Sequence, residues 1–196
     1  KINNPEEAGD KLVKILKLNT DKKFVTGIYP YSMMQSVFTP VDLGKHPHSL
    51  RVTTSSQEWC GHTFNMMDYR KGNFDVQLHS YFESEGDKNF KLEGAFLEDE
   101  IWTRIRIDHK SLPTGDIEIT PSALAARLSH RPQKVEKAEA KLLTESDTMT
   151  YHLTYNDFER ELKVHFEKAF PHKILGWEET YISGFGDSAK KMTTTA

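Results

Sequence analysis

Three side chains able to support hydrolysis lie close together in the sequence, at Glu58, Cys60 and His62. A histidine beside a cysteine can accept the thiol proton, and a carboxylate can orient the histidine, as in a thiol hydrolase. If the segment is a strand, its two-residue period places all three side chains on one face. The alternative is a free cysteine packed beneath Trp59, a common use of a thiol. Thioredoxin-type exchange within the chain is excluded, because Cys60 is its only cysteine.

Two further clusters suggest a metal site or acid–base chemistry. His46 and His48 form a His-x-His pair that could converge on one cation, but zinc needs three or four ligands and the sequence names two. Glu98, Asp99 and Glu100 could supply the paired carboxylates of a hydrolase. Neighbouring side chains point in different directions around a helix, so we predict instead that these three form its acidic first turn. We therefore expect no metal or other cofactor.

Large apolar and aromatic side chains are concentrated between residues 29 and 38. Methionine and aromatic side chains can line an adaptable binding surface, although they fill ordinary cores more often. If the chain binds a ligand, we expect these residues to line the site, together with two of the tryptophans. The seven candidates are Tyr29, Tyr31, Met33, Met34, Phe38, Trp59 and Trp102.

The composition limits the classes of function. Of the 196 residues, 37% are hydrophobic and 28% are charged, as in a folded domain. The net charge of −3, from 26 basic and 29 acidic residues, argues against a nucleic-acid partner, because phosphate binding needs an excess of basic residues. No run of about 18 apolar residues is present, so no segment is expected to span a membrane. No domain boundary is evident, and residues 1–196 are predicted to form a single mainly β domain.

Alternation with a period of two dominates the chain. Apolar and polar residues alternate over 50–57, 74–83, 149–155 and 162–167, which is typical of half-buried strands in antiparallel sheets. The sequence Arg-Lys-Gly-Asn at 70–73 predicts a hairpin turn. Together the patterns predict a mainly β fold of about eight to eleven strands. We expect a curved antiparallel sheet, either a half-barrel or an open barrel, wrapping one helix.

One segment has helical spacing instead. Leu97, Ile101 and Ile105 recur every four residues. We predict a helix over 94–107 that buries these three side chains against the concave face of the sheet. A second short helix is predicted over 122–128, because it follows a proline, which is tolerated in a first helical turn.

Five segments carry a family resemblance that spans nearly the whole chain. They are TGIYPYSMM at 26–34, SQEWCGH at 56–62, EDEIW at 98–102, SLPTG at 111–115 and LGWEE at 175–179. Together they resemble a family of uncharacterised Bacteroidetes lipoproteins, whose members often carry the label septum formation inhibitor Maf. True Maf proteins are α/β nucleotide pyrophosphatases, and their serine/arginine and acidic motifs have no counterpart in this sequence.

The resemblance implies a secreted lipoprotein whose acylated cysteine lies upstream of Lys1, in the periplasm or at the cell surface on the outer membrane. Contact with a membrane is then expected only through that anchor, which lies outside this chain. The order of a helix followed by Leu-Pro-x-Gly also looks like periplasmic half-barrel domains. We therefore expect a non-catalytic domain that binds an apolar ligand, a lipid or an envelope protein. The alternatives are a thiol- or carboxylate-dependent hydrolase and a structural subunit of an envelope assembly.

Overall fold

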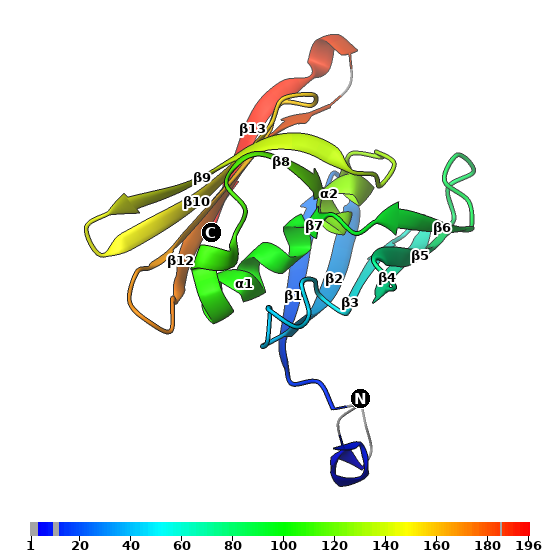
Figure 1. Cartoon of the computed structure of the whole chain (residues 1–196). Coiled ribbons are helices and arrows are strands. Elements are labelled where there is room, and N and C mark those ends of the chain that lie inside the picture. The colour runs from blue at the N-terminus through cyan, green and yellow to red at the C-terminus, as the bar shows by residue number, and fades with distance from the viewer. Residues whose placement is uncertain (1–3, 10–11, 185) are drawn as a thin grey trace. The chain divides into compact units, whose positions relative to one another are not determined.

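The computed structural model describes residues 4–9, 12–184 and 186–196. The chain is mainly β, as the two-residue alternation predicts, and its strands form two sheets (Figure 1). It falls into two compact units, Lys1–Gly94 and Ala95–Ala196, which we call the N-terminal and C-terminal units. Each unit contains one of the sheets, and over the described residues neither sheet closes into a barrel. That the whole chain acts as one domain stays a prediction.

The N-terminal unit is a six-stranded antiparallel sheet in which each strand pairs with the next in the sequence. Its strands are β1 (Ile15–Thr26), β2 (Tyr29–Pro40), β3 (Arg51–Glu58), β4 (Gly61–Arg70), β5 (Asn73–Ser80) and β6 (Lys88–Glu93), after a short 3-10 turn at Pro5–Glu7. The predicted hairpin is confirmed: Lys71 and Gly72 join β4 to β5 with φ of 51° and 86°. Positive φ at both central residues matches the twist of the flanking strands.

The alternating pattern gives this sheet one buried and one exposed face. On β2, Met33 and Val37 are 0% and 1% exposed, whereas Met34 between them is 48% exposed. The register continues the buried row across the sheet, from Met33 to Ser56 on β3 and on to Thr63 on β4. The buried apolar side chains of the unit are Met33, Val37, Val52, Met67, Phe74, Val76 and Leu92.

The C-terminal unit contains a seven-stranded sheet in the order β13-β12-β11-β10-β9-β8-β7. Its strands are β7 (Phe96–Leu97), β8 (Gly115–Thr120), β9 (Glu136–Glu145), β10 (Thr148–Tyr155), β11 (Arg160–Glu167), β12 (Ile174–Ser183) and β13 (Lys190–Thr195), with a 3-10 turn at Gly186–Ser188. All neighbouring pairs are antiparallel except β7–β8. The described strands thus outnumber the eight to eleven predicted, because short strands such as β7 have no alternation to reveal them.

The main helix, α1 (Ile101–Asp108), packs against this sheet. It follows a 3-10 turn, η3 (Glu98–Glu100), and leads into another, η4 (His109–Ser111). Leu97, Ile101 and Ile105 are all 0% exposed, so their predicted burial is confirmed. Ile101 and Ile105 belong to a core that includes Tyr151 and Val164 of the sheet.

The predicted start of this helix at residue 94 is wrong. Phe96 and Leu97 instead pair with β8 as the short strand β7, and the following turn is η3. The second predicted helix is confirmed as α2 (Ala123–Leu128). Its N-cap is Ser122, whose side chain accepts a hydrogen bond from the Leu124 backbone N–H at 3.2 Å.

Candidate functional site

Exposed apolar side chains gather at the ends of two neighbouring hairpins of the N-terminal unit. Val25, Ile28 and Tyr29, in and around the β1–β2 turn, are 66%, 70% and 41% exposed, and Trp59 in the β3–β4 turn is 69% exposed. The ring centroids of Tyr29 and Trp59 lie 6.0 Å apart in an edge-on contact, so the two turns touch. We call these four residues the tip patch.

An open hollow of about 570 Å³, the tip groove, lies beside the patch. Val25, Pro30 and Trp59 form its apolar part. Phe24 and Tyr31 pair across β1 and β2, and their rings stack with centroids 4.8 Å apart and planes 4° apart. This cross-strand aromatic pair stabilises the hairpin that carries the groove. The groove is lined by Lys23, Phe24, Val25, Pro30, Tyr31, Ser32, Gln57, Glu58, Trp59 and His62.

A row of polar side chains crosses the groove on four adjacent strands. Lys23 pairs with Ser32, Ser32 with Gln57, and Gln57 with His62. These positions alternate with the buried row, so they lie on the exposed face of the sheet. Lys23 lies 3.9 Å from Asp21, a weak and solvated ion pair. The groove therefore offers hydrogen-bond donors and acceptors beside an apolar wall.

The prediction that Glu58, Cys60 and His62 share one face of one strand is wrong. Strand β3 ends at Glu58, Cys60 lies in the turn, and β4 begins at Gly61. His62 pairs with Gln57, whereas Glu58 pairs with Gly61, so the two side chains lie on opposite faces of the ladder. The alternative of a cysteine packed beneath a tryptophan is also wrong, because Cys60 is exposed.

Glu58 holds the turn in place through hydrogen bonds and does not form a catalytic dyad with His62. Its carboxylate accepts a hydrogen bond from the Cys60 backbone N–H at 2.7 Å and another from the Tyr81 hydroxyl. The Tyr81 ring covers Gly61, where an added Cβ would lie 2.6 Å from it, so glycine is needed there. A hydrogen bond between the Cys60 thiol and Glu58 raises the pKa of the thiol, and the negative charge of Glu58 adds to this effect. A raised pKa makes the thiol a poorer nucleophile at neutral pH.

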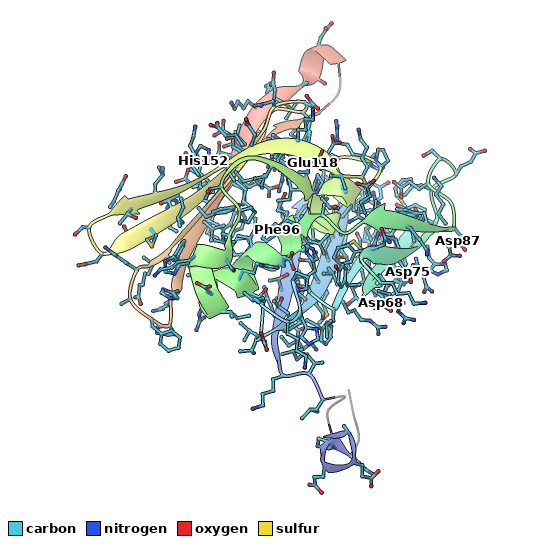
Figure 2. The ribbon with its side chains drawn as sticks, viewed as in Figure 1. Asp68, Asp75, Asp87, Phe96, Glu118 and His152 are labelled. Atoms are coloured by element: carbon cyan, nitrogen blue, oxygen red, sulfur yellow. The ribbon has the colours of Figure 1, made fainter. Side chains whose placement is uncertain are left out.

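We expect Glu58→Gln to accelerate alkylation of Cys60 at pH 7.5, because removing the carboxylate increases the thiolate fraction. The increase should be about two- to fivefold, with iodoacetamide incorporation followed by intact mass. Asp75→Asn, on β5 of the same unit (Figure 2), is the control and should leave the rate unchanged. An activated thiol, as a hydrolase requires, would instead make wild-type Cys60 react faster than a cysteine in an unstructured peptide.

The other predicted ligand-binding residues do not all converge on this site. Tyr31 and Trp59 line the groove and Tyr29 lies beside Trp59. Met33 is buried, Met34 and Phe38 lie further along β2, and none of the three is part of the lining. Trp102 belongs to the C-terminal unit, where it packs against the core and its ring lies 6.5 Å from that of Trp177.

The two histidines considered as possible metal ligands make other contacts. His48 packs against Tyr69 and Phe74, with ring centroids 4.9 and 5.8 Å away. His46 lies two residues earlier in the loop between β2 and β3, where its backbone N–H donates to the Asp42 carbonyl oxygen at 3.1 Å. Within the described part of the chain, no three His, Cys, Asp or Glu side chains come together as metal ligands.

The predicted acidic first turn is instead a buried ionic cluster in the C-terminal unit. Glu98, Asp99 and Glu100 are 2%, 2% and 0% exposed. Arg160 donates to both carboxylate oxygens of Glu98 at 2.6 Å, and the Tyr155 hydroxyl donates to one of them at 2.7 Å. Burial alone would raise the pKa of Glu98, but the charge and hydrogen bonds of Arg160 hold it below its usual value.

The neighbouring carboxylates also have structural partners. Asp99 accepts from the backbone N–H of Ala123, the first residue of α2, at 3.2 Å. Glu100 accepts from the Leu97 backbone N–H at 3.3 Å and lies 3.6 Å from Arg104. Three carboxylates that are buried and held in this way position η3 and α2, and they offer a substrate no accessible reacting group.

The site residues that the sequence did not reveal are Lys23, Phe24, Val25, Ile28, Pro30, Ser32 and Gln57. A partial signal existed, because Gly27-Ile28 between two alternating runs marks a tight turn with an apolar residue at its end. The cross-strand row could not be found, since it depends on the register of four strands.

No protein-family profile, curated protein or solved structure significantly matches this chain. Among the described residues, none of the helices has the length and apolar character needed to cross a membrane.

Proposed function

We propose that this chain is a non-catalytic domain of a cell-envelope lipoprotein and that it binds a protein partner through the tip patch. One observation carries the proposal: Val25, Ile28, Tyr29 and Trp59 are exposed together at one end of the N-terminal sheet. Tryptophan and tyrosine contribute more binding energy at protein interfaces than most residues. The polar row beside them supplies the hydrogen-bonding rim that usually surrounds such a patch.

The openness of the site favours a protein over an enclosed small molecule. Ligand pockets bury most of the surface of their ligand, whereas the apolar residues here lie on projecting turns. In the C-terminal unit, Ile101 and Ile105 of α1 are 0% exposed within the packed core. An exposed apolar patch on a chain that also has a packed core is the arrangement expected of a protein interaction site.

Assignment to the envelope is supported by the family resemblance. Two of its five segments, 26–34 and 56–62, contain Ile28, Tyr29 and Trp59, so they meet at the tip patch. Fractionation of cells that express the natural precursor tests the location. Recovery in the cytosolic fraction would refute the envelope assignment and leave the binding proposal standing.

The exposed thiol of Cys60 allows a direct search for the partner. A benzophenone maleimide attached to Cys60 lies next to Trp59, and illumination in an envelope extract links it to whatever occupies the tip. A captured protein counts as the partner only if the purified protein competes for capture and its binding depends on the tip patch.

Trp59→Ala is expected to weaken binding of that purified partner at least tenfold, since loss of a central aromatic residue typically costs about 2 kcal/mol or more. Isothermal titration gives the dissociation constant. Phe170→Ala is the matched control, because Phe170 is 80% exposed but belongs to the C-terminal unit. Equal dissociation constants for wild type and Trp59→Ala would show that the tip patch is not the interface.

The size of the tip groove favours a lipid as a second candidate. Its volume of about 570 Å³ falls within the range of small-molecule sites. Val25, Pro30 and Trp59 could contact an acyl chain, and Lys23 and His62 a polar headgroup. Native mass spectrometry of protein purified from its own envelope tests this: a co-purifying lipid supports it, and bare protein counts against it.

A further inference from the structure

A turn in the C-terminal unit is held against the end of α1 by two side-chain contacts. The turn spans residues 168–173, between β11 and β12. Arg106 Nε donates to the carbonyl oxygen of Pro171 at 2.7 Å. His109 Nδ1, in η4, lies 3.3 Å from His172 Nε2. We call the two histidines the clasp.

The hydrogen bonds of the clasp determine where its protons lie. His172 Nδ1 lies 3.3 Å from the backbone carbonyl oxygen of Glu167, which can only accept, so this nitrogen carries a proton. In the neutral ring His172 Nε2 is then an acceptor, and His109 Nδ1 donates to it. One additional proton, at His109 Nε2, leaves this hydrogen bond in place. When both rings are protonated, two N–H groups and two positive charges face each other.

The surroundings of the clasp disfavour that second charge. The ring centroid of Phe166 lies 5.8 Å from that of His109 and 6.5 Å from that of His172, and Phe170 lies 6.0 Å from His172. Burial lowers the pKa of His109, and the positive charge of protonated His172 lowers it further.

Charged residues flank both histidines of the clasp in the sequence. Asp108 raises the pKa of His109 and Lys110 lowers it, and desolvation and His172 outweigh Asp108. Lys168 also ties the turn to the β9–β10 connection, because its backbone N–H donates to the Asp147 carbonyl oxygen at 2.9 Å. The charged residues nearest in the sequence are Arg106, Asp108 and Lys110 around His109, and Glu167, Lys168 and Lys173 around His172.

The backbone of the turn is also held away from its preferred conformation. His172 has φ of 54°, in the left-handed region that few non-glycine residues occupy, although histidine does so more often than most. A residue in that region persists where the surrounding contacts require it. The contacts here are the clasp and the hydrogen bond from the His172 backbone N–H to the Ala169 carbonyl oxygen at 2.8 Å.

We propose that His109 and His172 form a proton-operated clasp, which releases the 168–173 turn and its exposed Phe170 from the end of α1 when both rings are protonated. This device is separate from the tip patch and does not depend on the proposed function. The direction of the pH effect follows from the pKa of His109, which is lower in the closed state than in the open one. Closure is therefore fully favoured above about pH 6.5, the ordinary histidine value, and is lost as the pH falls through the lowered pKa.

Amide hydrogen exchange of the 168–173 turn at pH 7.5 and pH 5.0 tests the clasp. After correction for intrinsic exchange rates, we expect protection of the wild-type turn to fall at least about threefold at pH 5.0. His109→Asn keeps a side-chain N–H donor toward His172 but cannot take up a proton, so most of this pH response should disappear. His152→Asn, on β10 of the same unit (Figure 2), is the control and should respond like wild type.

Two outcomes would overturn the proposal. One is wild-type protection that is equal at the two pH values after correction. The other is a pH response in His109→Asn as large as that of wild type, which would assign the effect to other groups. Unfolding curves at pH 7.5 verify that each variant is folded, so a lost response cannot be attributed to general destabilisation.

Discussion

Glu98→Ala is expected to lower the free energy of unfolding of the C-terminal unit by about 3–5 kcal/mol, because it leaves a buried guanidinium without its carboxylate. Arg160 is 6% exposed and donates to both oxygens of Glu98. Glu179 also accepts from Arg160, at 2.9 Å, but cannot replace a bidentate partner. Urea unfolding measures the loss. The reporter is tryptophan fluorescence in a Trp59→Phe background, where the remaining Trp102 and Trp177 both lie in the C-terminal unit.

The controls for this prediction separate a buried ion pair from an exposed one. Lys163→Ala removes a pair with Glu178 at 3.6 Å, whose side chains are 37% and 41% exposed, and should cost less than about 1 kcal/mol. The double variant Glu98→Leu, Arg160→Met removes both buried charges and should recover much of the loss. If Glu98→Ala costs no more than Lys163→Ala, the buried cluster does not stabilise this unit.

The ion pair between Glu98 and Arg160 makes the stability of this unit depend on pH. The pKa of Glu98 in the folded protein is below that of a glutamate in the unfolded chain, so Glu98 contributes its full stabilisation above about pH 4.3. The contribution is lost as the pH falls through the lowered value, because the native carboxylate must then take up a proton. The difference between wild type and Glu98→Ala should therefore shrink between pH 7 and pH 3.

Local patterns were sufficient to predict strands β3, β5, β10 and β11 and the buried face of α1. Ile101 and Ile105 are four residues apart, and that spacing places them on one side of the helix, whereas Leu97 is buried in strand β7. The role of Glu98 could not be predicted in this way, because its partner Arg160 lies 62 positions away in the sequence. A charged residue near a helix start is usually solvated, and only the tertiary structure shows that this one is buried.

Only some residues of the candidate site were predicted, because residue type alone does not show which side of a strand a residue occupies. Trp59 and Tyr29 were named because large aromatic residues suit binding surfaces, and the structure places them in contact. The same reasoning grouped Met33 with Met34, although adjacent residues of a strand point to opposite faces. The turn at Cys60 was missed because the strand pattern of β3 was extended through Trp59 to His62. The two-residue turn at Trp59 and Cys60 changes which residues share a face.

The packing of α1 against the seven-stranded sheet depends on a few fully buried side chains. Ile105 lies one helical turn after Ile101, and the core around them includes Leu153 and Phe166. All four side chains are 0% exposed. Interiors packed to this degree relax only partly when atoms are removed, so a shortened side chain leaves a cavity. The cost then exceeds the simple loss of buried apolar area.

Ile105→Ala is accordingly expected to destabilise the C-terminal unit by about 2–5 kcal/mol. Leu143→Ala is the matched control: Leu143 lies on β9 of the same unit but is 45% exposed, and the change should cost less than about 1 kcal/mol. Urea unfolding followed by the fluorescence of Trp102 and Trp177 measures both variants. Equal losses would mean that Ile105 is not enclosed between helix and sheet, and the arrangement that positions η3, η4 and the histidine clasp would have to be revised.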